Sequence, residues 1–236
     1  MRTRELPPPL PPEQRTVGQL IGETIRAYGQ RFWQALLLGL PLAAASQLSL
    51  GRGPGAQTLI LFAFTPLVAA AFLRACSLVH GVRPTATAFA CAVLVFAPVP
   101  FLIRFFVLPG VAWLALFGLS VPAAMVERLG FRRALERGRQ LALADFVHSV
   151  GSLAALVIVV VLSELTLISL LRSQGNNGQR VAHALADLVM SPLLYVGGAL
   201  LYVDQAARVV GSGRRAAVHP PLDADPAGHH DAQVEP

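Results

Sequence analysis

The feature that most constrains this chain is the segment from Ala86 to Val126, in which Arg104 is the only charged side chain. About 20 apolar residues in a helix cross the hydrocarbon core of a bilayer, so the segment is long enough for two crossings. Pro109 and Gly110 lie near its middle and favour a turn. We therefore predict a membrane-embedded helical hairpin with arms at about Ala86–Val107 and Pro109–Val126.

Four further apolar segments are long enough to span a membrane. The composition agrees, with 54% hydrophobic and 14% charged residues, against roughly 25% charged residues in soluble globular proteins. We expect an all-α polytopic membrane protein with about six transmembrane helices. The remaining spans are predicted at about Phe32–Leu50, Gln57–Leu78, Val147–Leu171 and Val181–Val203.

Two other segments alternate apolar and polar side chains with the period of a helix. They run from Thr16 to Phe32 and from Glu127 to Phe146. This pattern predicts two amphipathic interfacial helices that lie along the membrane surface. Thr16, followed by Gln19, predicts a capping box at the start of the first one.

The ends of the chain differ in composition from the part between them. Five prolines between residues 7 and 12 exclude a regular helix, so residues 1–15 are predicted to be a disordered, proline-rich cytoplasmic lead. Residues 16–208 form the predicted six-span membrane domain. Residues 209–236 are rich in Gly, Pro, Asp and His and are predicted to be a disordered cytoplasmic tail.

All nineteen basic residues are arginines, and they are distributed unevenly across the predicted spans. Fifteen lie on one side, and only Arg52, Arg104, Arg172 and Arg180 lie on the other. Loops rich in arginine stay in the cytoplasm, so both termini are predicted to be cytoplasmic. The net charge of +6 then points to anionic membrane lipids as partners and not to nucleic acid.

Three stretches carry a resemblance to a known family: VGQLIGETIRAYGQRFWQALLL, LPGVAWLALFGLSVPAAMVERLGFRRALERGRQLA and LLYVDQAAR. Over about residues 16–208 the chain resembles the six-span membrane domain attached to some bacterial glycerophosphoryl diester phosphodiesterases, and related stand-alone proteins. The resemblance implies a module of the bacterial inner membrane. The catalytic barrel of the larger relatives has no counterpart in this sequence, so no active site is implied.

Ionisable side chains inside predicted spans are costly unless they are paired or hydrated. Four of them fall toward the extracytoplasmic ends of the spans: Arg104, Glu164, His183 and Asp187. They could form an external site in which the arginine holds an anionic group and the other three relay protons. Alternatively they form structural ion pairs between helices, with the arginine neutralising a carboxylate.

The second amphipathic segment concentrates positive charge on its polar face. The candidate contacts to lipid headgroups are Arg128, Arg132, Arg133, Arg137 and Arg139. These arginines could bind phosphate groups or serve only to fix the topology. Glu127 at the start of the segment could orient it through a salt bridge, or could be a solvated charge at a helix end.

No catalytic motif of a common hydrolase, kinase or metalloprotease is present. Cys76 and Cys91 lie in apolar segments and are predicted to be packing residues. We expect no metal, no cofactor and no enzymatic activity. The first hypothesis is a non-catalytic scaffold or accessory module that contacts anionic lipid, a membrane-protein partner or itself. The alternatives are a small transporter or channel component, and a membrane-embedded lipid phosphodiesterase.

Overall fold

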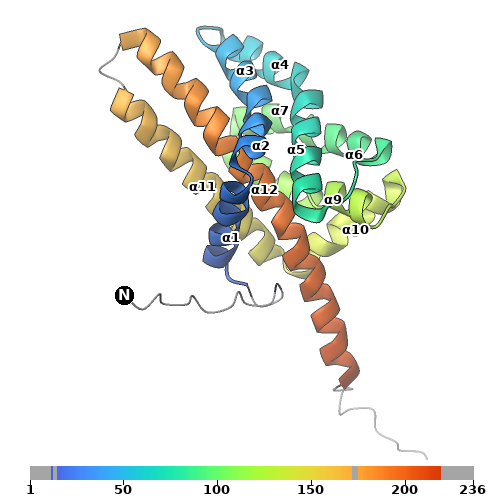
Figure 1. Ribbon diagram of the computed structural model, residues 1–236. Helices are drawn as coiled ribbons and strands as arrows, with labels where there is room; N and C mark the ends of the chain where they lie inside the picture. The colour runs from blue at the N-terminus through green and yellow to red at the C-terminus, as the bar shows by residue number, and fades with distance from the viewer. Residues whose placement is uncertain (1–11, 13–14, 172–174, 219–236) are drawn as a thin grey trace, which may run out of the picture.

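The computed structural model describes residue 12, residues 15–171 and residues 175–218. Every regular element in this part is a helix, and it contains no strand (Figure 1). The predicted all-α class is therefore confirmed. The predicted lead lies outside the described residues except at positions 12 and 15. The predicted tail is wrong for residues 209–218, which continue the last helix, and its remainder lies outside the described residues.

Four helical segments of the described chain are long and apolar enough to cross a membrane. Two consist of a helix pair, and two belong to the long helices of the C-terminal half. A fifth is the pair α4 (Pro54–Ala63) and α5 (Thr65–His80), which is bent by 49°. The chain is thus a polytopic helical membrane protein. The four segments are α6–α7 (Ala86–Phe96, Val99–Phe105), α8–α9 (Val107–Phe117, Ser120–Val126), α11 (Phe146–Leu171) and, within α12 (Gly175–Val218), Arg180–Val210.

The first predicted span is not one helix, and it is not among the four or five segments of the described chain that are long and apolar enough to cross a membrane. It is divided into α2 (Phe32–Leu36), the 3-10 turn η2 (Leu37–Gly39) and α3 (Leu40–Ser49). Pro41 lies in the first turn of α3, where a missing N–H is tolerated. A Cβ on Gly39 would lie 2.3 Å from the carbonyl oxygen of Leu188 in α12. Only glycine allows the two backbones to approach this closely.

The hairpin turn between α7 and α8 comes earlier than the sequence suggests. Phe106 is the extended residue between the two helices, with φ −156° and ψ 149°. Pro109 and Gly110 lie inside α8, which begins at Val107. The proline sits in the first helical turn, where its missing N–H would have had no partner in the helix. It therefore starts a helix here and does not end one.

Both predicted amphipathic helices are present, as α1 (Val17–Gln30) and α10 (Phe131–Ala144). The Thr16–Gln19 capping box is confirmed. The apolar faces of both helices pack on the protein's own bundle: Leu20 and Tyr28 of α1 and Leu141 of α10 are buried. Packing within the protein thus accounts for part of each apolar face, whereas Ile25 of α1 and Leu143 of α10 are about half exposed.

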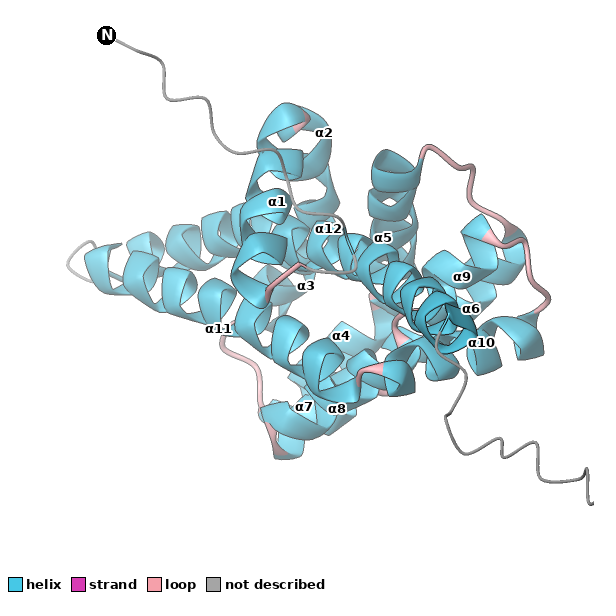
Figure 2. Ribbon diagram, turned by 90° about the horizontal axis from the view of Figure 1, so that it is seen from below, coloured by secondary structure: helices cyan, strands magenta, loops and turns pink. Residues whose placement is uncertain are grey.

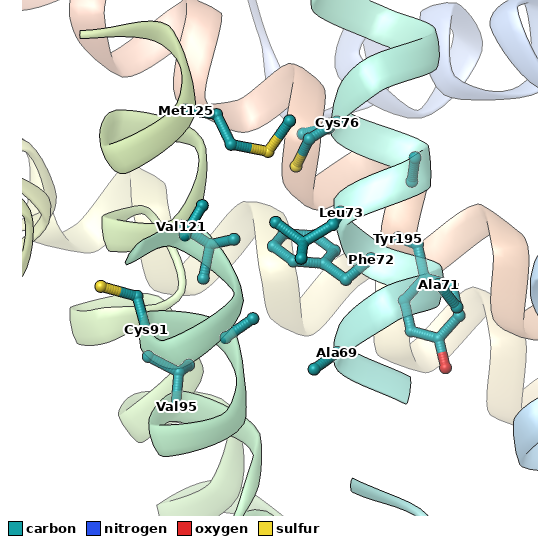
Figure 3. Packing of buried hydrophobic residues seen from close by; sticks show 14 of the residues in the cluster. Ala69, Ala71, Phe72, Leu73, Cys76, Cys91, Val95, Val121, Met125 and Tyr195 are labelled. Carbon is teal, nitrogen blue, oxygen red and sulfur yellow. The ribbon is translucent and has the colours of Figure 1, made fainter. Parts of the chain in front are cut away.

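Helix α12 is the central element of the bundle. It packs against α1 and α11 on one side and against α5 and α10 on the other (Figures 1 and 2). The main core lies between α5, α6, α9 and α12, where Phe72, Met125 and Tyr195 are buried (Figure 3). Cys76 and Cys91 are both fully buried there, which confirms their packing role.

The two ends of the bundle differ in charge. At one end lie the C-terminal part of α5, the loop to α6, the end of α9 and helix α10. We call this the arginine-rich end. The opposite end contains the α3–α4 loop and the start of α12. The exposed arginines of the arginine-rich end are Arg74, Arg83, Arg128, Arg132, Arg133 and Arg139.

Candidate functional site

The structure brings together three of the four ionisable residues predicted to cluster inside the membrane. Nδ1 of His183 on α12 lies 3.5 Å from a carboxylate oxygen of Glu164 on α11. Asp187, one helical turn further along α12, lies beside the Ser46 hydroxyl of α3 and near both of these side chains. The result is a small polar cluster at the opposite end of the bundle, open on one side, since about a third of the His183 and Glu164 side chains is exposed.

Arg104 does not join this cluster. It is exposed on α7, and it makes no ion pair or hydrogen bond with any other residue that the structure describes. The reason is the packing of α7, which lies against α4 and α8 and not against the α11–α12 hairpin. The interpretation in which this arginine neutralises one of the cluster's carboxylates is therefore wrong.

At the arginine-rich end, Glu127 connects three elements. The carboxylate follows α9 and accepts from Nε of Arg137 on α10, at 3.0 and 3.2 Å to its two oxygens. It also accepts from the Tyr202 hydroxyl of α12 at 2.9 Å. The predicted orienting salt bridge is confirmed. Arg137, one of the predicted headgroup ligands, thus makes a contact within the protein through its Nε.

The other four predicted headgroup ligands are exposed and have no protein partner among the described residues: Arg128, Arg132, Arg133 and Arg139. Three of them lie on α10, which packs on the bundle, and Arg128 lies in the loop before it. A Cβ on Gly138 would lie 2.3 Å from the Ser120 hydroxyl oxygen of α9, so the two helices are in direct contact. Arg132, Arg133 and Arg139 therefore project from a helix that is packed directly on the bundle.

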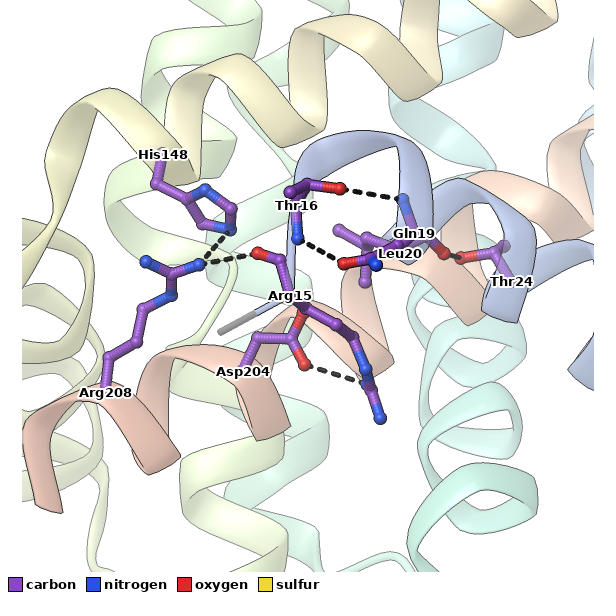
Figure 4. Close-up of polar contacts among 8 residues, drawn as sticks. All are labelled: Arg15, Thr16, Gln19, Leu20, Thr24, His148, Asp204 and Arg208. Atoms are coloured by element: carbon purple, nitrogen blue, oxygen red, sulfur yellow. Dashed lines mark hydrogen bonds and ion pairs between the residues drawn. The ribbon is translucent and has the colours of Figure 1, made fainter. Parts of the chain in front are cut away.

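A third group of polar residues joins the start of α1 to α11 and α12 (Figure 4). Arg15 donates to a carboxylate oxygen of Asp204 at 2.9 Å, and Asp204 is fully buried. Arg208, one turn along α12, donates to Asp145 at 3.0 Å and to the backbone oxygen of Arg15 at 2.7 Å. His148 of α11 lies 3.2 Å from the same guanidinium. We call these five residues the Arg15–Asp204 junction.

The sequence alone did not reveal this junction. Asp204 and Arg208 are four residues apart in an apolar segment, a spacing that brings two side chains to one face of a helix. This spacing predicts that Asp204 and Arg208 lie on one face of the last helix. The principal partner of Asp204, however, lies 189 residues away in the chain. No local pattern connects the two.

The contacts that the structure shows at these sites are ion pairs and hydrogen bonds. Among the described residues, no group of three or more His, Cys, Asp or Glu side chains is placed to hold a metal ion. Comparison of the chain with models of protein families, with curated proteins and with solved structures gave no match. The resemblance to the phosphodiesterase membrane domain therefore rests on the quoted sequence stretches.

Proposed function

We propose that the chain is a non-catalytic scaffold or accessory module of the bacterial inner membrane, with its arginine-rich end in the cytoplasm. In this proposal the polar face of α10 contacts the headgroups of anionic lipids. The observation that carries it is a division among the arginines. Arg15, Arg137 and Arg208 are paired with carboxylates of the protein, whereas Arg132, Arg133 and their exposed neighbours pair with no carboxylate in the part of the chain that the structure describes.

This division is informative because Arg15, Arg137 and Arg208, which hold separate segments of the fold together, each have an acidic partner. Within the described chain, the exposed arginines of α10 do not serve that structural purpose. Glu127 pairs with Arg137, while Arg133, one turn earlier on the same helix, has no carboxylate partner among the described residues. Guanidinium groups bind phosphate oxygens with two parallel hydrogen bonds. A basic surface near the membrane gains about 1 kcal/mol per arginine from anionic lipid. The unpaired arginines of α10 thus fit a negatively charged bilayer surface.

The double variant Arg132→Gln/Arg133→Gln tests this proposal. The matched control is Arg52→Gln/Arg180→Gln, which removes two exposed arginines from the opposite end of the bundle. The measurement is the enrichment of fluorescent phosphatidylglycerol over phosphatidylcholine around the reconstituted protein, by energy transfer from a donor dye attached at the arginine-rich end. The first variant should lose about 1 kcal/mol of lipid preference per charge, and the control should keep it. Equal enrichment in both variants and the native chain would refute the proposal.

A further inference from the structure

A groove runs along the outer surface between α5 and the broken first segment of the chain. Its volume is about 400 Å³. One wall is the face of α5 on which Leu67, Ala70, Ala71, Arg74 and Leu78 lie. The other wall consists of Gln34, Leu37, Leu38 and Pro41 from α2, η2 and α3.

Two features of the sequence explain why this groove exists. Ala70 and Ala71 have small side chains, so the α5 wall leaves space that a larger residue would fill. Gly39 lies directly against the backbone of Leu188, which holds the middle of the broken segment on α12. The base of the groove is closed by buried residues, and its rim is apolar and open, because Leu37 is 62% and Leu67 is 53% exposed.

The polar residues of the groove all lie at one of its ends. The broken segment and α5 run in opposite directions, so Gln34 and Arg74 lie at the arginine-rich end of the groove. Pro41 and Leu67 lie at the other end of the groove, further from the arginine-rich end. Leu67 and Arg74 are seven residues apart, which is about 10 Å along a helix. Arg74 is exposed and has no partner among the described residues.

Arg31 extends the polar end of the groove. Its guanidinium donates to the carbonyl oxygen of Leu78 at 3.0 Å. The same arginine lines a second cavity of about 240 Å³ together with Gln30, Leu78 and Val196. The two cavities share Leu78. The groove thus has arginines at one end and apolar side chains along the rest of its length. A phospholipid has the same order, with a charged headgroup followed by an acyl chain.

We propose that this groove binds a single phospholipid with an anionic headgroup, with its acyl chain along Leu37, Ala70 and Leu67 and its phosphate at Arg74. The proposal rests on the proposed function in one respect, namely that the arginine-rich end lies at headgroup level. It adds a defined site to the diffuse contact proposed for α10. Charge decides the occupant, because an apolar partner helix in the groove would leave Arg74 without an anion.

The test is native mass spectrometry of the full chain released from nanodiscs that contain phosphatidylglycerol and phosphatidylethanolamine, which differ in mass. The native protein should retain one phosphatidylglycerol after the weakly bound lipids have been removed. Arg74→Gln should lower the affinity for this lipid about fivefold, the change that corresponds to about 1 kcal/mol. Arg83→Gln is the matched control, since Arg83 is exposed at the same end of the bundle and does not line the groove.

A second variant tests the shape of the groove independently of the charge of Arg74. Ala70→Leu fills the groove and keeps Arg74, and it should also release the retained lipid. Retention of phosphatidylglycerol in both Arg74→Gln and Ala70→Leu would overturn the proposal, and so would a protein subunit bound in place of the lipid.

The two proposals can fail separately. The variant Arg132→Gln/Arg133→Gln should reduce the enrichment of anionic lipid around the protein and leave the single retained lipid in place. If the retained lipid is lost in that double variant but not in Arg74→Gln, the groove proposal is wrong and the headgroup contact of α10 stands.

Discussion

The α11–α12 hairpin carries a group of charged side chains at each end, and the two groups differ in burial. At the arginine-rich end, Arg15 and the fully buried Asp204 are 2.9 Å apart. At the opposite end, His183 and Glu164 are 3.5 Å apart, and about a third of each side chain is exposed. Both pairs join α12 to another segment of the chain. Only at the arginine-rich end would loss of one partner leave a charge inside the protein.

This difference determines how much each contact should contribute to stability. An ion removed from water needs its partner, and deletion of that partner costs about 3–5 kcal/mol in buried pairs. A half-exposed pair regains hydration when it is broken, so its contribution is at most about 1 kcal/mol. The Arg15–Asp204 junction is thus the place where α1 depends most strongly on α12.

The largest effect is expected for Arg15→Ala, which leaves the carboxylate of Asp204 buried without its nearest cation. We expect the free energy of unfolding in detergent micelles to fall by about 3 kcal/mol. Arg26→Ala is the control on the same helix, because Arg26 forms an exposed pair with Glu23 at 3.6 Å; it should change stability by less than about 0.5 kcal/mol. If the two variants lowered the free energy of unfolding equally, burial would not explain how much an ion pair contributes to stability.

A smaller effect is expected for Tyr202→Phe, which deletes the hydrogen bond to Glu127 but no charge. Hydrogen bonds to charged groups contribute about 1.5 kcal/mol or somewhat more, and the loss should appear in the same unfolding measurement. Tyr195→Phe, also on α12, removes a hydroxyl that has no hydrogen-bond partner among the described residues, and it should have almost no effect. A larger loss for Tyr195→Phe would contradict the role given to Glu127.

The smallest effect is expected for Glu164→Gln at the opposite end. The pair with His183 is long and about a third exposed, so the change should be about 0.5 kcal/mol. Unfolding of the single variants and of Glu164→Gln/His183→Gln together gives the coupling between the two residues. A coupling near that of Arg15 and Asp204 would show that burial does not separate the two pairs.

The fold class, the two amphipathic helices and the Thr16–Gln19 cap could be predicted because each depends on local sequence. Apolar length and helical period decide these elements before the chain packs. The break in the first span was missed, since it depends on a close contact between Gly39 and Leu188. The hairpin turn was misplaced for a related reason: Pro109 can start a helix as readily as end one, and neighbouring packing decides which.

The candidate sites could be predicted only in part. Glu164 and Asp187 were expected at similar depths on adjacent helices, and the structure places both of them near His183. Arg104 lies at a comparable depth but on a helix that packs elsewhere, and depth gives no information about lateral position in a bundle. Of the five arginines assigned to headgroups, Arg137 has an internal partner. Helical spacing could not distinguish it from Arg133, one turn away.

Helix α12 continues without interruption from Gly175 to Val218, through Pro192, and extends beyond the rest of the bundle (Figure 1). Between the contact of Leu188 with Gly39 and the end of the helix lie thirty residues, or about 45 Å. A tilt of roughly 10° about that contact would therefore displace the far end by about 8 Å. The uninterrupted length of α12 therefore means that a small change of angle at the Gly39 contact would become a large displacement at the far end of the helix.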